Sequence, residues 1–137
     1  MSLEATRQVV TAYVQDHGNP SYLAEDAVFT DMGTGEEYRG RDAIAQSLEY
    51  FYHQAFEAHP EVRSTVIDDG RAVAEGEFVG RHIGDFAGIP ATGREVRVPI
   101  CVAYDLEGDK ITRARIYLLG NVLMQQLGAI SESAHVG

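Results

Sequence analysis

The sequence has very little cysteine, with only Cys101 among its 137 residues. A single cysteine excludes a disulfide framework and a thiolate metal site built within one chain. Long apolar runs are also missing, since none approaches the roughly 18 residues that a membrane span needs. The first seven residues lack the basic-then-apolar order of a signal peptide. These absences predict a protein of the reducing cytoplasm without a membrane partner.

Positive charge is also scarce. The chain carries 11 Lys and Arg residues against 21 Asp and Glu residues, a net charge of −10. Such a surface repels phosphate backbones and anionic lipids, so nucleic acid is not expected as a partner. Histidines do not occur at the spacing of a helical metal site, and the glycines between residues 84 and 93 do not form a strand–loop–helix phosphate site. We therefore expect neither a metal nor a cofactor.

The remaining composition is ordinary for a soluble globule, with 45% hydrophobic and 23% charged residues. The length predicts one domain over residues 1–137, because no linker or internal repeat divides the chain. Residues 129–137 are expected to form a loose tail at its end.

The spacing of apolar residues changes from helical to strand-like halfway along the chain. Helices are predicted at residues 4–17, near Tyr22, from residue 41 to Pro60, and at residues 122–127. Strands are predicted at residues 27–31, 61–68, 71–82, 95–106 and 110–119, with hairpin turns at 69–70 and 108–109. Helices followed by a meander of strands indicate an α+β fold. We expect a cone-shaped, curved antiparallel sheet wrapped by the N-terminal helices around a central cavity.

Two late segments carry a recognisable pattern, residues 80–94 (GRHIGDFAGIPATGR) and residues 117–128 (YLLGNVLMQQLG). They resemble two runs of the SnoaL-like polyketide cyclases and ester cyclases, which belong to the nuclear-transport-factor-2-like superfamily. Residues 24–31 and 40–44 fit the same superfamily. The resemblance implies an enzyme of natural product biosynthesis that encloses a small hydrophobic, carbonyl-bearing substrate. Proton abstraction would lead to cyclisation or isomerisation without a cofactor.

The superfamily also includes the ketosteroid isomerases, and the likeness to them implies catalytic roles for two early residues. Tyr13 stands where the isomerases place an oxyanion-hole tyrosine, and Asp31 stands where they place the general base. The residues alone leave other interpretations open. Tyr13 lies on an apolar helical stripe and suits the core. Asp31 precedes Met32 and Gly33 and suits the cap of a turn.

Two positions depart from the patterns of these relatives. Leu119 stands where the cyclases place a catalytic aspartate, and Cys101 stands where the isomerases keep a protonated aspartate. The alternative function is therefore a non-catalytic member of the superfamily that binds a small molecule and has lost the catalytic acid.

The strand predicted at residues 71–82 places His82 and Phe78 on the face that curves around the expected cavity. His82 would relay a proton there, and Phe78 would contact the substrate. The alternative is a histidine that holds the loop at residues 84–93 by hydrogen bonds. His53 is expected at the mouth of the cavity, or else as a solvated helix residue.

The last strand decides which other residues contact the substrate. If Leu119 faces the cavity, as the resemblance implies, Arg115 and Tyr117 do so too, because side chains alternate along a strand. Cys101 would then line the cavity as a small apolar group. A homodimer is expected to form across the convex face of the sheet. The apolar residues predicted for that interface are Val98, Ile100, Val102, Ile116 and Leu118.

Overall fold

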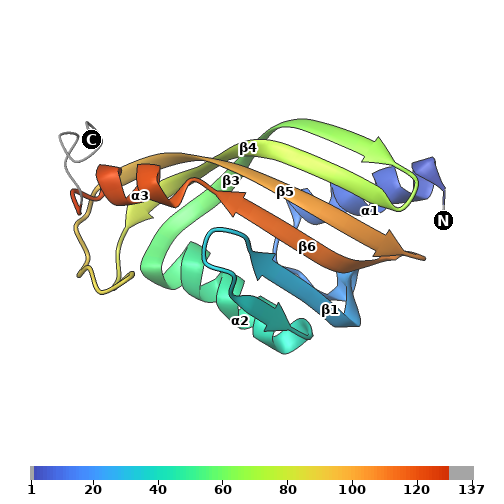
Figure 1. Cartoon of the computed structure of the whole chain (residues 1–137), viewed down its shortest axis with the longest axis horizontal. Coiled ribbons are helices and arrows are strands. Elements are labelled where there is room, and N and C mark those ends of the chain that lie inside the picture. The colour runs from blue at the N-terminus through green and yellow to red at the C-terminus, as the bar shows by residue number, and fades with distance from the viewer. Residues whose placement is uncertain (1, 130–137) are drawn as a thin grey trace.

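The computed structural model describes residues 2–129 and contains a six-stranded sheet with α1 and α2 packed against one of its faces (Figure 1). The elements are α1 (Leu3–Gln15), η1 (Pro20–Tyr22), β1 (Leu23–Asp31), β2 (Glu37–Arg39), α2 (Arg41–Glu49), η2 (Tyr50–Ala55), β3 (Phe56–Asp68), β4 (Arg71–His82), β5 (Glu95–Glu107), β6 (Lys110–Leu118) and α3 (Gly120–Gln126). The predicted α+β fold is confirmed. Apart from Ala129, the tail predicted at residues 129–137 lies outside the described residues.

The strand order across the sheet is β2-β1-β6-β5-β4-β3, and every neighbouring pair is antiparallel except β1 and β6. The sheet is therefore mixed: it is antiparallel as predicted except at the β1–β6 pair, which the sequence did not indicate. A parallel pair needs a long connection, which the chain from β2 through β5 supplies. The hairpin turns at residues 69–70 and 108–109 are confirmed, with Gly70 and Gly108 at φ values of 77° and 60°.

The second helix is shorter than predicted. α2 ends at Glu49, the chain continues as the π-helical segment η2, and β3 begins at Phe56. Pro60 therefore lies inside a strand rather than at a helix end. Because β3 is an edge strand, a proline that donates no hydrogen bond is tolerated there. Within residues 2–129, no helix has the length and apolar character that crossing a membrane requires.

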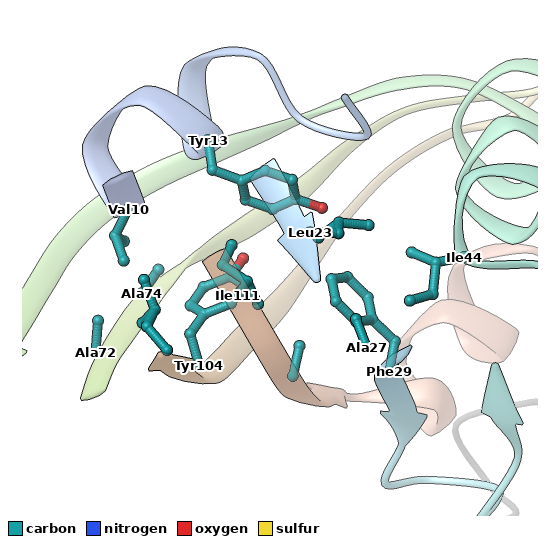
Figure 2. Close-up of a cluster of buried hydrophobic side chains, with 12 residues drawn as sticks. Val10, Tyr13, Leu23, Ala27, Phe29, Ile44, Ala72, Ala74, Tyr104 and Ile111 are labelled. Atoms are coloured by element: carbon teal, nitrogen blue, oxygen red, sulfur yellow. The ribbon is translucent and has the colours of Figure 1, made fainter. Parts of the chain in front are cut away.

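We call the helix-covered face of the sheet the inner face and the opposite one the outer face. One buried cluster lies between α1 and the inner face, where Tyr13 from α1 packs above Tyr104 from β5 (Figure 2). A second cluster surrounds Phe78 and includes Leu123 of α3. These two clusters hold the helices against the sheet and enclose the candidate site.

Candidate functional site

The inner face holds a pocket of about 30 Å³ between α1, η2 and strands β3 to β5. Its walls include Val14, His17, Tyr52, Ala74, Val102 and Tyr104. A space of this size holds about one water-sized group. Aromatic and small apolar side chains fill the rest of the interior that the sequence predicted as a central cavity.

Three aromatic side chains line this pocket, His17, Tyr52 and Tyr104. Tyr13 does not line it but packs against His17 and Tyr104, and we call the four residues together the tyrosine pocket. Tyr13 and His17 come from the C-terminal part of α1 and the turn after it, Tyr52 from η2 and Tyr104 from β5. The ring centroid of His17 lies 4.7 Å from that of Tyr52 and 5.7 Å from that of Tyr13. Tyr13 and Tyr104 are 5.9 Å apart and nearly perpendicular. Figure 2 shows the Tyr104 hydroxyl directed up toward Tyr13.

The three tyrosines remain protonated donors. Burial raises the pKa of Tyr13, and the backbone of Gly18 only partly offsets the effect. Burial also raises the pKa of Tyr52 and of Tyr104, and that of Tyr104 rises further because the hydroxyls of Tyr13 and Tyr52 lie nearby. The Tyr13 hydroxyl is fully buried and has no hydrogen-bond partner of normal geometry among the described residues. Leaving such a group unpaired costs about 1–3 kcal/mol.

His17 is the one residue of the tyrosine pocket that carries a basic nitrogen. Burial, with a smaller contribution from the nearby His53, lowers the pKa of His17 to about 4. The imidazole is therefore neutral at neutral pH. Sequence reasoning missed His17, because His17-Gly18 looked like the end of a helix. Its position four residues after Tyr13, on the same helical face, was the available signal.

Asp31 lies at the end of β1 and caps the turn that follows. Its Oδ1 accepts hydrogen bonds from the backbone N–H groups of Gly33, at 2.8 Å, and Thr34, at 3.3 Å. Asp31 does not line the pocket at the tyrosines. The turn-capping interpretation is confirmed, and the role of Asp31 as a general base stays a prediction.

His82 lies on the inner side of β4, as predicted, and is fully buried. Its Nδ1 accepts a hydrogen bond from the backbone N–H of Thr92 at 3.1 Å and lies 3.0 Å from the Thr92 hydroxyl. This arrangement confirms the interpretation that the histidine holds the loop at residues 84–93. His82 does not line the pocket at the tyrosines, and its role as a proton relay stays a prediction.

The last strand has the opposite orientation from the predicted one. Ala114 of β6 pairs with buried Tyr104, and Ile116 with Val102, which lines the pocket. These two pairs put Ala114, Ile116 and Leu118 on the inner face, and Arg113, Arg115 and Tyr117 on the outer face. Ile111, which precedes the register shift in the β5–β6 pair, is instead buried in the inner cluster.

Four residues predicted to contact substrate from the inner side therefore do not line it: Cys101, Arg115, Tyr117 and Leu119. Cys101 is the partner of Tyr117 across the β5–β6 pair. Arg115 instead forms a bidentate pair with Asp105, with nitrogen–oxygen distances of 3.0 and 3.1 Å. Leu119 is 48% exposed at the N-cap of α3. The prediction that these four residues line the cavity is wrong, because the two arginines of β6 lie on the outer face, where Arg115 is paired with Asp105, and the apolar residues that alternate with them are buried.

The residues predicted for a dimer interface also lie on the opposite face of the sheet from the predicted one. Val98, Ile100, Val102, Ile116 and Leu118 belong to the inner-facing set and pack in the core. These five residues are not available on the convex face, so this part of the prediction is wrong.

Phe78 and His53 take different places. Phe78 is fully buried on the inner face and stacks on Phe51 with a centroid distance of 4.4 Å. It forms part of the core behind the pocket. His53 is exposed on η2, close enough to His17 to lower its pKa. Contact of either residue with a substrate stays a prediction.

The two late sequence motifs meet at the start of β5. The side-chain amide of Gln126 binds the backbone of Arg97 on both sides, accepting from its N–H at 2.8 Å and donating to its carbonyl at 2.9 Å. The guanidinium of Arg94 reaches the Gln126 carbonyl at 3.4 Å. These contacts dock α3 beside β5 where β6 does not reach, so the motif residues have a structural task. Among residues 2–129, no group of three or more His, Cys, Asp or Glu side chains is arranged to hold a metal.

The fold and these motifs define a class of small α+β proteins, and comparison identifies the family. Residues 7–127 match the model of the SnoaL-like polyketide cyclase family. The chain therefore belongs to the SnoaL-like polyketide cyclase family. No curated protein matches the sequence at a significant level.

Solved structures share the fold over most of their length. A candidate SnoaL-like polyketide cyclase from Jannaschia sp. CCS1 has 14% identity and a TM-score of 0.82, covering 93% of this chain and 94% of that chain. A candidate polyketide cyclase from Pseudomonas putida KT2440 has 26% identity and a TM-score of 0.74, covering 92% and 98%. A protein of ketosteroid isomerase-like fold from Catenulispora acidiphila DSM 44928, in complex with trimethylamine, has 17% identity and a TM-score of 0.72, covering 90% and 94%.

Proposed function

We propose that this protein is an enzyme that binds an apolar, carbonyl-bearing substrate at the tyrosine pocket and catalyses a proton transfer next to the carbonyl. The observation that carries the proposal is the buried Tyr13 hydroxyl without a partner. A fold tolerates an unpaired buried donor where a ligand completes it. Membership of a polyketide cyclase family supports a substrate of this class.

The chemistry follows from the donors. Removing a proton beside a carbonyl moves negative charge onto the carbonyl oxygen. Tyrosine hydroxyls that are already in place, in surroundings with little water, stabilise that charge by several kcal/mol relative to the starting ketone. The resulting enolate can attack a second carbonyl of the same molecule and close a ring, or take its proton back at another carbon. Both outcomes need a base and hydrogen-bond donors, and neither needs a cofactor.

The size of the pocket defines which part of a substrate enters it. About 30 Å³ accommodates a carbonyl group rather than a ring system. The pocket reaches β3, which is the edge strand of the sheet. We propose that the reacting carbonyl lies among the tyrosines and that the remainder of the substrate extends toward this edge.

A second function, binding without catalysis, is favoured by a different observation. The carboxylate of Asp31 caps a turn, and position 119 carries an exposed leucine. The two carboxylates that relatives would use are thus engaged elsewhere or missing. In that case the tyrosines would hold the carbonyl of a bound small molecule that leaves unchanged.

Substitution of Tyr13 by phenylalanine separates these functions. The probe is 2-tetralone, a fused-ring ketone whose protons beside the carbonyl exchange with deuterium in D₂O. We expect wild-type protein to accelerate this exchange, followed by proton NMR, and Tyr13→Phe to slow it by about 10²–10³-fold, the usual effect of losing one oxyanion donor. Because the substitution removes an unpaired buried hydroxyl, the variant should melt at the wild-type temperature or above it.

Tyr117→Phe is the matched control, since Tyr117 lies on the outer face and should not affect exchange. Wild-type protein that binds the ketone but exchanges it no faster than buffer would support the binding function and contradict catalysis.

We also propose a homodimer, formed through the outer face of the sheet. Val73 pairs with Val66 on one side and Ala103 on the other, and Cys101 pairs with Tyr117, so these side chains form one strip across four strands. Val66 is 66% exposed and Tyr117 is 47% exposed in the single chain. An exposed apolar strip of this kind marks an interaction surface.

Light scattering tests the dimer. We expect a particle of twice the 15.0 kDa chain mass at micromolar concentration, and a monomer for Val73→Asp, because the substitution would bury a charge in the interface. Met32→Asp serves as control, since Met32 is another exposed apolar residue but lies in the β1–β2 turn. A 15.0 kDa wild-type particle would contradict the proposal. The cytoplasmic location also stays a prediction.

A further inference from the structure

The mechanism proposed above needs a base, and the residues around the pocket identify one. His17 lines the pocket, and its ring stands edge-on to Tyr52 at a centroid distance of 4.7 Å. Its ring nitrogens form no hydrogen bond within residues 2–129, whereas His82, whose Nδ1 is bound to Thr92 and whose Nε2 is buried without a partner, does not line this pocket. The imidazole of His17 therefore keeps its lone pair available to a ligand.

The other titratable groups around the pocket cannot take this role. Tyr104 lines the pocket and Tyr13 packs against Tyr104 and His17, and both remain protonated phenols. Glu61 and Glu75 contribute to the pocket wall, but Glu61 is bound to Arg97 at 3.0 Å, and Glu75 pairs with outer-facing Cys101. The remaining neighbours are Tyr52 and His53. Tyr52 is another protonated phenol, and His53 lies on η2, near His17, with its side chain exposed.

We infer that His17 is the general base of the proposed reaction, taking the proton from the carbon beside a substrate carbonyl held by the tyrosine hydroxyls. This role of His17 rests on the proposed function and supplies the base that the proposed proton transfer requires. In the step, the carbon–hydrogen bond breaks, its electron pair forms the enolate double bond, and the carbonyl π pair moves onto oxygen. The proton goes to the free nitrogen of His17. The step is balanced, since the imidazolium later returns a proton to carbon in an isomerisation, or to the alkoxide oxygen that forms when the enolate attacks a second carbonyl.

The surroundings of His17 give its imidazole a basicity that suits this proton transfer, and no carboxylate is needed. Its pKa of about 4 is close to that of the aspartate base of ketosteroid isomerases, about 4.6. A carboxylate among these apolar groups would have to lose its hydration, which is costly for a charge. A neutral imidazole avoids that cost. Once protonated, it attracts the enolate across a short distance in a poorly screened site.

The test compares His17→Gln with Asp31→Asn in the 2-tetralone exchange assay. Glutamine keeps a polar side chain of similar reach but is no base, and asparagine at position 31 can still accept the Gly33 hydrogen bond. We expect His17→Gln to slow exchange by about 10²–10⁴-fold, the span of general-base catalysis, and Asp31→Asn to stay within about two-fold of wild type. The wild-type rate should be constant near neutral pH and fall to half at about pH 4, as His17 takes up a proton.

A second variant keeps the test valid if glutamine disturbs folding. In His17→Ala the ring is removed, and added imidazole should restore exchange by entering the space. Slow exchange by Asp31→Asn with wild-type exchange by His17→Gln would overturn the inference and leave the proposed function standing, with Asp31 as the base. Wild-type protein that exchanges the ketone no faster than buffer would overturn both.

Discussion

Gly76→Ala is expected to lower the unfolding free energy by about 3 kcal/mol or more, because overpacking against backbone cannot be relieved by a rotamer change. Gly76 lies in β4 on the inner face, where β3 crosses over it opposite Val62. A methyl group there would overlap the backbone carbonyl of Glu61 and come within 2.9 Å of the Val62 Cα. Moving β3 away would open its ladder with β4, which is the longest in the sheet.

Thermal unfolding followed by circular dichroism measures the effect. For a chain of this length, about 3 kcal/mol corresponds to a fall in Tm of roughly 10 °C. Gly120→Ala is the matched control, since nothing lies within 4 Å of the added methyl group and the residue opens α3. Equal melting temperatures for Gly76→Ala and wild type would mean that β3 does not approach β4 this closely.

The same contact explains the shape of the site. Gly76 and Val62 both line the pocket at the tyrosines, and the register of β3 shifts between Val62 and Ser64. The close crossing and the shift bring the edge strand under α1, which closes the pocket on that side. Glycine is needed at position 76 because the backbone of a neighbouring strand approaches it closely.

The long strands β4, β5 and β6 and the two hairpin turns were predictable because local chemistry determines them, whereas the short strand β2 was not predicted. Gly70 and Gly108 supply positive φ at the two hairpins, and the flanking β-branched runs fix where strands begin. The helix–strand boundary near Pro60 was not predictable in the same way. Residues 50–55 keep a helical apolar pattern but form a π-helical segment, and only the packing of Phe56 and Tyr52 into one core decides where the helix stops.

The phase of β6 shows how a resemblance can mislead where simple physics would not. Arg113 and Arg115 alternate with Ala114 and Ile116, and alternation alone places the arginines in water. The prediction instead followed the expected place of position 119. In the structure Leu119 lies beyond the end of β6, at the start of α3, so its expected role fixed the wrong phase for the whole strand.

The candidate site was harder to predict than the fold because its residues come from distant parts of the chain. Tyr13 was identified on its helical stripe, but Tyr104 and Tyr52 look like ordinary core aromatics in the sequence. His17 follows the end of α1 and becomes significant only when η2 brings Tyr52 against it. Such tertiary proximity has no local sequence signal, whereas a turn cap such as Asp31 has one.

Phe78→Ala is expected to have the largest effect on stability, a loss of about 3–5 kcal/mol, which is the usual cost of deleting a fully buried phenylalanine ring. Phe78 stacks on Phe51 and also meets Tyr52 and Phe56 edge-on, at centroid distances of 5.1 and 5.2 Å. Removing it leaves a cavity among three aromatic rings and withdraws the support of Tyr52. Phe78→Leu is the control, because it keeps most of the apolar volume and should cost clearly less.

Urea unfolding of both variants gives the free energies, and the 2-tetralone assay distinguishes a supporting residue from a substrate contact. If Phe78 only supports the pocket, Phe78→Leu should keep the wild-type affinity for the ketone while losing modest stability. If Phe78 contacts the substrate, as the sequence predicted, affinity should fall even in the well-folded leucine variant. A Phe78→Ala protein that unfolds within about 1 kcal/mol of wild type would contradict the packing argument, because a ring buried on every side cannot be removed so cheaply.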